Sequence, residues 1–306
     1  MKILVLGSNG LVGSSVCRNL AESNKIEIIK STRDTTNLFL LEETKELIKN
    51  SKPDVILNAA AKVGGILANN SSRTEFILEN LKININLLES LIQYPNIKLI
   101  NLGSSCIYPL GATVPIKEES LMTGKLEPTN SPYAMAKLTA IEMGNAIKQQ
   151  YGHQIINLMP TNLYGPNDNF SGDNSHVIPG LIFRMHKAKV NKDLEFTVWG
   201  TGAPLREFLY VDDLAQAIEF IILNDIEEEV LNVGSGFEVS IINLVELIKD
   251  TIGYKGEIIF DKNYPDGNPR KLLDSNKLSN YGWSAKTRLD EGLKITYDWF
   301  KNNFNF

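Results

Sequence analysis

The sequence contains few of the residues that hold disulfide-rich or metal-dependent folds together. Among its 306 residues are two cysteines, Cys17 and Cys106, and three histidines. Two cysteines make no disulfide framework and are typical of a protein from a reducing compartment. The chain also lacks an excess of positive charge, because its formal net charge is -5. We therefore expect no nucleic-acid partner, since phosphate backbones are bound by basic surfaces.

Long hydrophobic runs are missing as well. No stretch approaches the roughly 20 apolar residues of a transmembrane helix. The apolar start of the chain breaks at Gly7, which is too early for a signal-peptide core. We expect a cytoplasmic protein with no membrane partner. Hydrophobic residues make up 43% and charged residues 22% of the chain, which are the proportions of a globular protein.

Short apolar runs alternate with helical patterns in the first half of the chain. The expected strands are residues 3–6, 26–29, 54–58, 98–102 and 154–158. The expected helices are residues 11–22, a segment that ends before Pro53, and residues 74–94 and 132–151. Continuous apolar strands separated by helices are typical of a parallel sheet covered on both faces.

The second half of the chain is less regular. Its expected helices and strands are residues 179–189, 214–223, 230–233, 240–252, 257–260 and 289–302. We predict an α/β fold with a doubly wound parallel (Rossmann) sheet and a smaller α/β lobe that binds the substrate. The sheet domain comprises residues 1–163 and 205–232, and the lobe comprises residues 164–204 and 233–306. A ligand is expected between them, beyond the carboxyl ends of the strands.

A glycine-rich turn joins the first expected strand to the first expected helix. Gly7, Gly10 and Gly13 have the spacing G-x-x-G-x-x-G. Glycines allow a tight turn and a close approach to a pyrophosphate, and the helix N-terminus offers N–H groups to the anion. The spacing alone is a weak signal, but its position between a strand and a helix favours a dinucleotide site.

The end of the second strand indicates which dinucleotide is bound. In this fold a carboxylate at that place contacts the adenosine ribose of NAD, and an arginine accommodates the 2′-phosphate of NADP. Here no carboxylate follows the strand directly, and Arg33 is placed to meet a phosphate. We favour NADP(H) over NAD(H). The alternative is that Arg33 is only a solvated surface cation.

Tyr133 and Lys137 form the second motif. Residues four apart on a helix share one face, and an ammonium beside a phenol favours the ionised form and is expected to lower its pKa from about 10. A phenol tuned in this way can exchange a proton with a substrate oxygen, an effect worth about 10²–10⁴ in rate. Ser104, just after the strand at 98–102, can bond the same oxygen.

The motifs occur here in the order typical of the extended short-chain dehydrogenase/reductase family, which the sequence resembles. Longer segments resemble one branch of that family, the GDP-L-fucose synthases. That branch epimerises C3 and C5 and reduces C4 of GDP-4-keto-6-deoxy-D-mannose with NADPH. The segments that carry the resemblance are residues 60–66, 103–109, 126–130, 159–166, 174–179 and 265–274.

The resemblance implies a role for each of five catalytic residues. Ser104, Tyr133 and Lys137 are the reductase triad, and Cys106 and His176 are the epimerisation pair. A C4 ketone acidifies the C–H bonds at C3 and C5, and each inversion needs a base on one face and an acid on the other. A thiol and an imidazole have ordinary pKa values that bracket neutral pH, which suits this exchange.

The resemblance also implies which residues bind the two ligands. The expected cofactor residues are Gly7, Asn9, Gly10, Leu11, Val12, Gly13, Arg33, Ala60, Leu102, Gly103, Ser104, Tyr133, Lys137, Pro160, Asn162, Leu163 and His176. The expected residues for the GDP-linked sugar are Arg184, Trp199, Arg206 and Lys271. Asn9 departs from the family, whose members often carry a basic residue there. No metal site is expected, and a homodimer through the helices at 74–94 and 132–151 is implied.

Two other functions fit the same sequence. The first is a C4 reductase, with or without epimerase activity, for a related GDP-4-keto-6-deoxy sugar such as a 6-deoxy-heptose or a colitose precursor. The second is a non-catalytic protein that binds NADP. Cys17, His153 and His186 lie outside the motifs and are expected to be structural or surface residues.

Overall fold

Six parallel strands form the central sheet of the protein. The structure, a computed structural model, describes residues 1–23, 25–172, 175–264 and 266–304. The sheet order is β2-β1-β3-β4-β5-β9, and every neighbouring pair is parallel. The strands are β1 (Lys2–Leu6), β2 (Glu27–Ser31), β3 (Val55–Asn58), β4 (Lys98–Leu102), β5 (Ile155–Pro160) and β9 (Val230–Val233). The predicted doubly wound parallel sheet is therefore confirmed.

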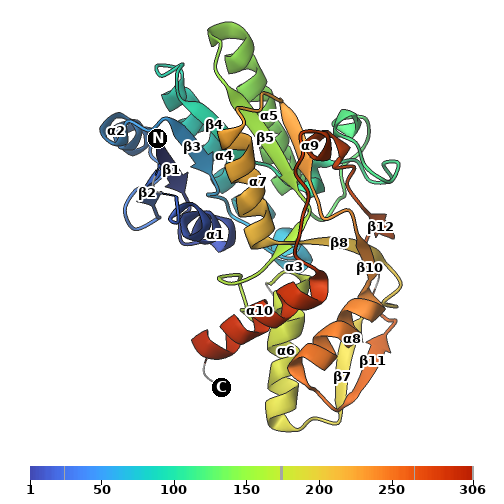
Figure 1. Cartoon of the computed structure of the whole chain (residues 1–306). Coiled ribbons are helices and arrows are strands. Elements are labelled where there is room, and N and C mark those ends of the chain that lie inside the picture. The colour runs from blue at the N-terminus through green and yellow to red at the C-terminus, as the bar shows by residue number, and fades with distance from the viewer. Residues whose placement is uncertain (24, 173–174, 265, 305–306) are drawn as a thin grey trace.

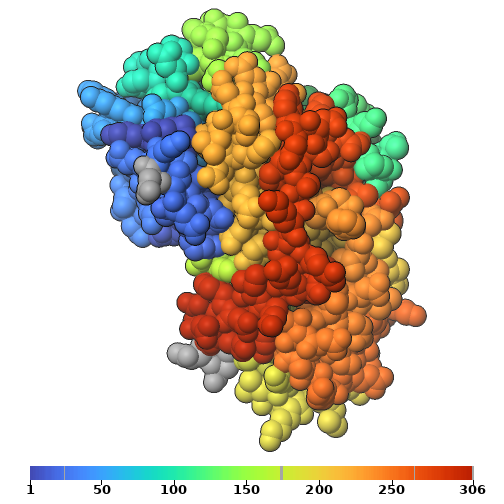
Figure 2. Space-filling model, in the orientation of Figure 1, coloured from blue at the N-terminus to red at the C-terminus, as the bar shows by residue number. Residues whose placement is uncertain are grey.

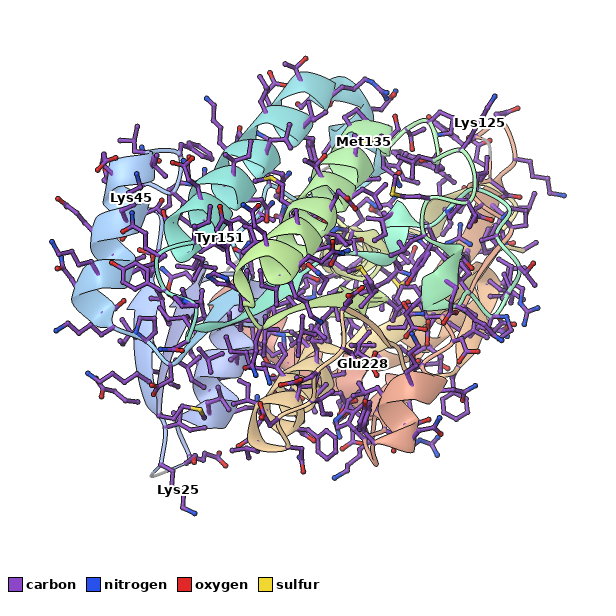
Figure 3. The ribbon with its side chains drawn as sticks, turned by 90° about the horizontal axis from the view of Figure 1, so that it is seen from above. Lys25, Lys45, Lys125, Met135, Tyr151 and Glu228 are labelled. Atoms are coloured by element: carbon purple, nitrogen blue, oxygen red, sulfur yellow. The ribbon has the colours of Figure 1, made fainter. Side chains whose placement is uncertain are left out.

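Each face of the sheet has its own hydrophobic core. Side chains of a strand point alternately to the two faces, so Ile3 and Val5 of β1 belong to one core and Leu4 and Leu6 to the other. The first core is closed by α1 (Leu11–Leu20) and α7 (Val211–Leu223), and it contains the buried Cys17. The second is closed by α2 (Leu41–Ser51), α4 (Arg73–Leu91) and α5 (Ser131–Tyr151). Figure 3 shows α4 and α5 side by side over the sheet.

The winding of the sheet reverses at β1. The chain steps from β1 outward to β2 and then returns to β3 on the other side of β1. Ligands of such sheets bind at this switch point, beyond the carboxyl ends of the strands. Here the glycine turn after β1 meets the segment after β3 closely, because a Cβ on Gly7 would lie 2.9 Å from the backbone nitrogen of Ala60.

A second part of the chain packs below the sheet (Figures 1 and 2). Its strand β8 (Leu205–Tyr210) pairs with β10 (Glu238–Ser240), β12 (Arg270–Lys271) and β6 (Asn162–Tyr164). Another pair joins β7 (Glu195–Trp199) to β11 (Glu257–Asp261). The helices α6 (Val177–Asn191), α8 (Ile241–Ile252) and α10 (Leu289–Asn303) cover these strands around one core. Strand β8 serves two cores, since Leu209 faces that of the sheet while Phe208 and Tyr210 face that of the lobe.

The predicted start and end of the helix near residues 240–252 are confirmed. The Ser240 hydroxyl accepts a hydrogen bond from the Asn243 N–H at 3.2 Å and caps α8, which ends at Gly253 in the left-handed conformation. The sequence patterns missed α3 (Ile66–Ser71), α9 (Asn276–Asn280) and the strands β6, β7, β8, β10 and β12.

Among the described residues, no helix is both long and apolar enough to span a bilayer.

Candidate active site

Helix α5 places Tyr133 and Lys137 on one buried face. Pro132 lies in the first turn of the helix, where its missing N–H costs nothing. Both side chains are buried, and the Lys137 Nζ lies 5.9 Å from the centre of the Tyr133 ring. The Lys137 Nζ also donates a hydrogen bond of 2.6 Å to the carbonyl of Leu102, the last residue of β4. The predicted approach of the tyrosine and the lysine is confirmed.

Burial controls the proton affinities of both groups. It lowers the pKa of Lys137 to about 8. It raises the pKa of Tyr133, and negative charge on Cys106 adds to the increase, while a hydrogen bond with the Ser104 side chain opposes it. The expected lowering of the Tyr133 pKa by the ammonium is therefore wrong for this structure. The free energy lost when a phenolate is removed from water exceeds the stabilisation that the neighbouring groups provide.

Cys106 lies beside this group and contacts Lys271 of β12. It lies in a short 3₁₀ turn, Ser105–Ile107, directly after β4, and its N–H donates to the Ser104 Oγ at 3.2 Å. The Lys271 Nζ lies 3.6 Å from the Cys106 Sγ. Arg206 is next to Lys271 in the register of β8 and β12. Burial lowers the pKa of Arg206, and the negative charges of Asp266 and Cys106 act against this.

His176 lies at the N-terminus of α6, in the cap position, with its side chain 44% exposed. Its Nδ1 is 4.0 Å from the Oδ1 of Asp168, a buried carboxylate that the sequence patterns did not single out. Among the contacts of the described residues, none joins His176 to Cys106 or Tyr133. The structure therefore brings four of the five predicted catalytic residues together and places His176 in a separate cluster with Asp168.

Arg184 and Trp199 form a further cluster in the lobe. The Arg184 guanidinium lies 5.5 Å from the centre of the Trp199 ring. Trp199 also stacks on Tyr264, with ring centres 4.8 Å apart, which the sequence did not reveal. Asp266 accepts hydrogen bonds from the N–H and hydroxyl of Thr201 and so fixes the loop between β7 and β8. An aromatic surface beside guanidinium groups can bind a base and a phosphate.

The glycine turn fits a dinucleotide. Gly7 has a φ of +73°, and a Cβ on Gly13 would lie 2.2 Å from the Gly7 carbonyl oxygen. Helix α1 begins without a side-chain cap, so its first N–H groups are available to a pyrophosphate. Other predicted cofactor residues lie at or just beyond the ends of β3, β4 and β5, namely Ala60, Leu102, Gly103 and Pro160, or in β6, namely Asn162 and Leu163.

Arg33 lies just beyond β2 and is largely exposed. Its guanidinium is 3.9 Å from Glu79 and 5.9 Å from the centre of the Phe39 ring. Glu79 also pairs with Lys62, at 2.8 Å. Arg33 and Lys62 therefore both lie beside Glu79, beyond the carboxyl ends of β2 and β3. In the described part of the chain, no cluster of three or more His, Cys, Asp or Glu side chains is arranged to hold a metal ion.

Comparison with known proteins shows the family. Residues 3–234 match the model of the NAD dependent epimerase/dehydratase family, and the chain belongs to that family. It is 48% identical to GDP-L-fucose synthase 1 of Arabidopsis thaliana, over 99% of this chain and 94% of that protein.

Two solved structures are similar over nearly the whole chain. A GDP-L-fucose synthetase from Naegleria fowleri bound to NADP has a TM-score of 0.90 and 29% identity, and the match covers 99% of this chain and 93% of that one. A GDP-6-OMe-4-keto-L-xylo-heptose reductase from C. jejuni has a TM-score of 0.92 and 29% identity, over 99% and 98% of the two chains. Both the synthases and the C4 reductases of GDP-sugars are therefore structural neighbours.

Proposed function

We propose that the protein converts GDP-4-keto-6-deoxy-D-mannose into GDP-L-fucose, with epimerisation at C3 and C5 and NADPH-dependent reduction at C4. The observation that carries the proposal is the position of Cys106. It lies next to the Ser104, Tyr133 and Lys137 group, and the Lys271 ammonium of the lobe is 3.6 Å from its sulfur. The 48% identity to a GDP-L-fucose synthase supports the same conclusion.

Reduction uses the buried group on α5. NADPH, when bound along the glycine turn, supplies the hydride for C4. Tyr133 gives a proton to the C4 oxygen. Because burial raises its pKa, the phenol carries its proton at neutral pH, which is the form that a donor needs. Ser104 bonds the same oxygen, and Lys137, anchored on the Leu102 carbonyl, holds the nicotinamide ribose.

Epimerisation uses Cys106 and His176. One of them removes the proton from C3 or C5 to give an enolate, and the other delivers a proton to the opposite face of the same carbon. The Lys271 ammonium is placed to stabilise negative charge on the sulfur. The substrate diphosphate is bound by Arg184 and Arg206, because guanidinium groups match phosphate oxygens in pairs.

The two ligands are assigned to two parts of the chain. Residues 1–163 and 205–232 bind NADP, and Arg33 contacts its 2′-phosphate. Residues 164–204 and 233–306 bind the GDP-sugar, which Trp199 contacts. The remaining cofactor contacts are those at the glycine turn and at the ends of β3, β4 and β5. We place the enzyme in the cytoplasm, where it supplies a sugar nucleotide for polysaccharide synthesis.

The test of the main proposal supplies GDP-4-keto-6-deoxy-D-mannose and NADPH to the purified protein. We expect NADPH to be oxidised and GDP-L-fucose to be identified by NMR. Tyr133→Phe is the matched variant, because it removes one hydroxyl and is expected to slow turnover by about 10²–10⁴. No oxidation of NADPH by the wild type contradicts the proposal, and equal turnover by Tyr133→Phe contradicts the role of the phenol.

A C4 reductase for a related GDP-sugar is the second candidate. It is favoured by the TM-score of 0.92 to a GDP-heptose reductase. Deuterium uptake at C3 and C5 in heavy water, without NADPH, separates the two functions. Uptake supports the synthase. Its absence, together with NADPH oxidation by a ketone that already has the product configuration, supports the reductase.

A homodimer through α4 and α5 completes the proposal. Apolar side chains are exposed on these two helices, among them Leu78 at 49%, Ile85 at 38% and Met135 at 48%. Met135 is labelled on α5 in Figure 3, where the helix pair lies on the outside of the molecule. Burying such side chains against a second copy stabilises a dimer. A light-scattering mass equal to one chain at micromolar concentration would contradict it.

A further inference from the structure

Asp168 is a buried carboxylate beside His176 that has no role in the scheme above. Its side chain is 4% exposed, and its Oδ1 lies 4.0 Å from the His176 Nδ1. The Oδ1 accepts a hydrogen bond of 2.8 Å from the Asn169 N–H. In the described part of the chain, the Oδ2 has no hydrogen-bond partner although it is buried. Such an atom costs free energy unless another state of the protein gives it a partner.

The carboxylate is held in place by its own turn. The Asp168 N–H donates to the Gly165 carbonyl at 3.3 Å, and Asn167 between them has a φ of +66°. The same residue therefore uses its backbone to close the turn and one carboxylate oxygen to order the next residue. These contacts leave Oδ2 without a partner among the described residues and leave Oδ1, the oxygen nearer His176, able to accept a second hydrogen bond.

His176 occupies the N-cap position of α6 without a capping hydrogen bond from its side chain, and nearly half of that side chain is open to solvent. The ring presents Nδ1 to Asp168. The second nitrogen, Nε2, lies across the ring from Nδ1 and therefore faces away from the carboxylate. Among the described residues, Asp168 is the only carboxylate within ion-pair distance of His176.

We infer that Asp168 is a positioning residue for His176, accepting a hydrogen bond from Nδ1–H so that Nε2 faces the substrate carbon. The inference rests on the proposed epimerase function. In this structure the two groups are 4.0 Å apart, and hydrogen bonds between catalytic groups are often long before the substrate is bound. A small movement of the exposed ring brings Nδ1 into contact with Oδ1, which can accept a second hydrogen bond beside that of Asn169.

The pair accounts for both proton positions that epimerisation requires. With the proton on Nδ1 bonded to Asp168, the lone pair of Nε2 accepts the proton from the substrate carbon. The imidazolium that forms is stabilised by the carboxylate, and the Cys106 thiol delivers a proton to the other face of the enolate. When the direction is reversed, the imidazolium is the donor and the thiolate the acceptor. In either direction the carboxylate holds the proton on Nδ1 and leaves Nε2 to exchange a proton with the substrate.

Proton NMR of the substrate-free protein tests the pair without using activity. The chain has three histidines, so the His176 resonance is assigned by its loss in His176→Gln. We expect Asp168→Asn, which has nearly the same shape, to move the His176 titration midpoint downward, because the negative charge beside Nδ1 is lost. His186, whose Nδ1 lies 2.9 Å from the Tyr297 hydroxyl, is the internal control and should not move.

Ser175→Ala is the matched control variant. Its hydroxyl is also buried without a partner among the described residues, and it precedes His176 directly. We expect this change to leave the His176 midpoint in place. A midpoint that moves in Ser175→Ala and stays in Asp168→Asn would overturn the inference, as would a midpoint that is the same in the wild type and in both variants.

Activity gives the second arm of the test. In heavy water without NADPH, Asp168→Asn should slow deuterium uptake at C3 and C5 by about ten- to hundredfold and move the pH profile of uptake downward. Reduction of a ketone with the product configuration should keep its rate, which shows that the variant is folded. In the His176→Gln background, Asp168→Asn should have no further effect, because it acts through the histidine.

The outcomes separate this inference from the proposed function. If the wild type takes up no deuterium, the epimerase function fails, while the NMR titration still reports on the pair. If the wild type takes up deuterium and Asp168→Asn does so at the same rate with the same pH profile, the inference is wrong and the function stands.

Discussion

At the scale of single residues, Cys106 separates two activities that share one substrate. Replacing its sulfur by oxygen leaves the triad intact but provides a hydroxyl that does not ionise near neutral pH. We therefore expect Cys106→Ser to abolish deuterium uptake at C3 and C5, a loss of at least about 10²-fold. Reduction of a ketone that already has the product configuration should continue. Equal loss of both activities would show that Cys106 has no separate role.

Lys137 illustrates a cost in stability that is tied to function. Its pKa is lowered to about 8 by burial, whereas an unfolded lysine titrates near 10.4. Between these values the unfolded chain binds more protons, so stability attributable to this residue rises with pH from about 8 to about 10.4. At pH 7 the buried ammonium is destabilising.

We expect Lys137→Met to be inactive as a reductase and more stable at pH 7, by about 1–3 kcal/mol after the lost hydrogen bond to Leu102 is counted. The gain should shrink as the pH approaches 10. Urea unfolding of both proteins at pH 7 and pH 9.5 measures it. A gain that grows with pH would mean that the lysine is not a buried cation in the native state.

What the sequence could predict at this scale depended on spacing and resemblance. The approach of Tyr133 and Lys137 follows from their positions four apart on one helix. Asp168 and Tyr264 could not be found in this way, because their partners, His176 and Trp199, are brought to them by loops and by a different strand pairing. The pKa of Tyr133 was predicted in the wrong direction, since burial cannot be read from the spacing.

At the scale of elements, continuous apolar strands and long helices were predictable, while the short strands of the lobe were not. Strand β6 has three residues and β12 has two, which is too short for a period to show. Both strands pair with β8. The partner of β6 is 46 positions away, at Tyr164 with Tyr210, and the partner of β12 is 65 positions away, at Arg270 with Leu205. Such pairings are set by tertiary contacts.

The glycine turn allows a prediction at the same scale. A Cβ on Gly13 would lie 2.2 Å from the Gly7 carbonyl oxygen, so Gly13→Ala must displace the turn. We expect a loss of about 1–3 kcal/mol in the free energy of unfolding and at least about tenfold weaker NADPH binding, which corresponds to about 1.4 kcal/mol. Denaturant unfolding and calorimetric titration measure the two effects.

A second helical glycine provides the control for stability. A Cβ on Gly180 in α6 would be 3.5 Å from its nearest neighbours, an ordinary contact. Alanine is favoured over glycine within a helix by about 1 kcal/mol, so Gly180→Ala should leave stability unchanged or raise it. If Gly13→Ala were equally harmless, the close approach of the turn to α1 would not constrain the cofactor site.

At the scale of the whole molecule, Glu207 connects the sheet domain to the lobe. It is fully buried on β8, and its two carboxylate oxygens accept the N–H groups of Gly236, at 2.8 Å, and Leu273, at 3.0 Å. Its carbonyl accepts hydrogen bonds from the side chains of Thr161, just beyond β5, and Asn162, the first residue of β6. One residue thus holds the strand ends of the sheet and the segment that follows Lys271.

Removing this carboxylate should affect stability and substrate affinity together. Glu207→Ala leaves the buried Leu273 N–H without an acceptor, at about 1–3 kcal/mol, while the Gly236 N–H belongs to an exposed residue that water can reach. We therefore expect unfolding to require about 1–3 kcal/mol less. Lys271 lies two residues before Leu273, so KM for the GDP-sugar should rise. NADPH affinity should change little, because the backbone contacts to β5 remain. Denaturant unfolding, KM measurements and NADPH titration check these three effects.

A substitution at Gly234 tests whether the Glu207 carboxylate must occupy its present position. A Cβ there would lie 2.3 Å from the Glu207 Oε1, so Gly234→Ala should destabilise the wild type by pushing the carboxylate away from Gly236. In the Glu207→Ala background the same change meets no carboxylate and should cost markedly less. The non-additive part of such a cycle isolates the contact. Full additivity of the two losses would show that Glu207 and Gly234 act on the fold independently and that the connection between the domains lies elsewhere.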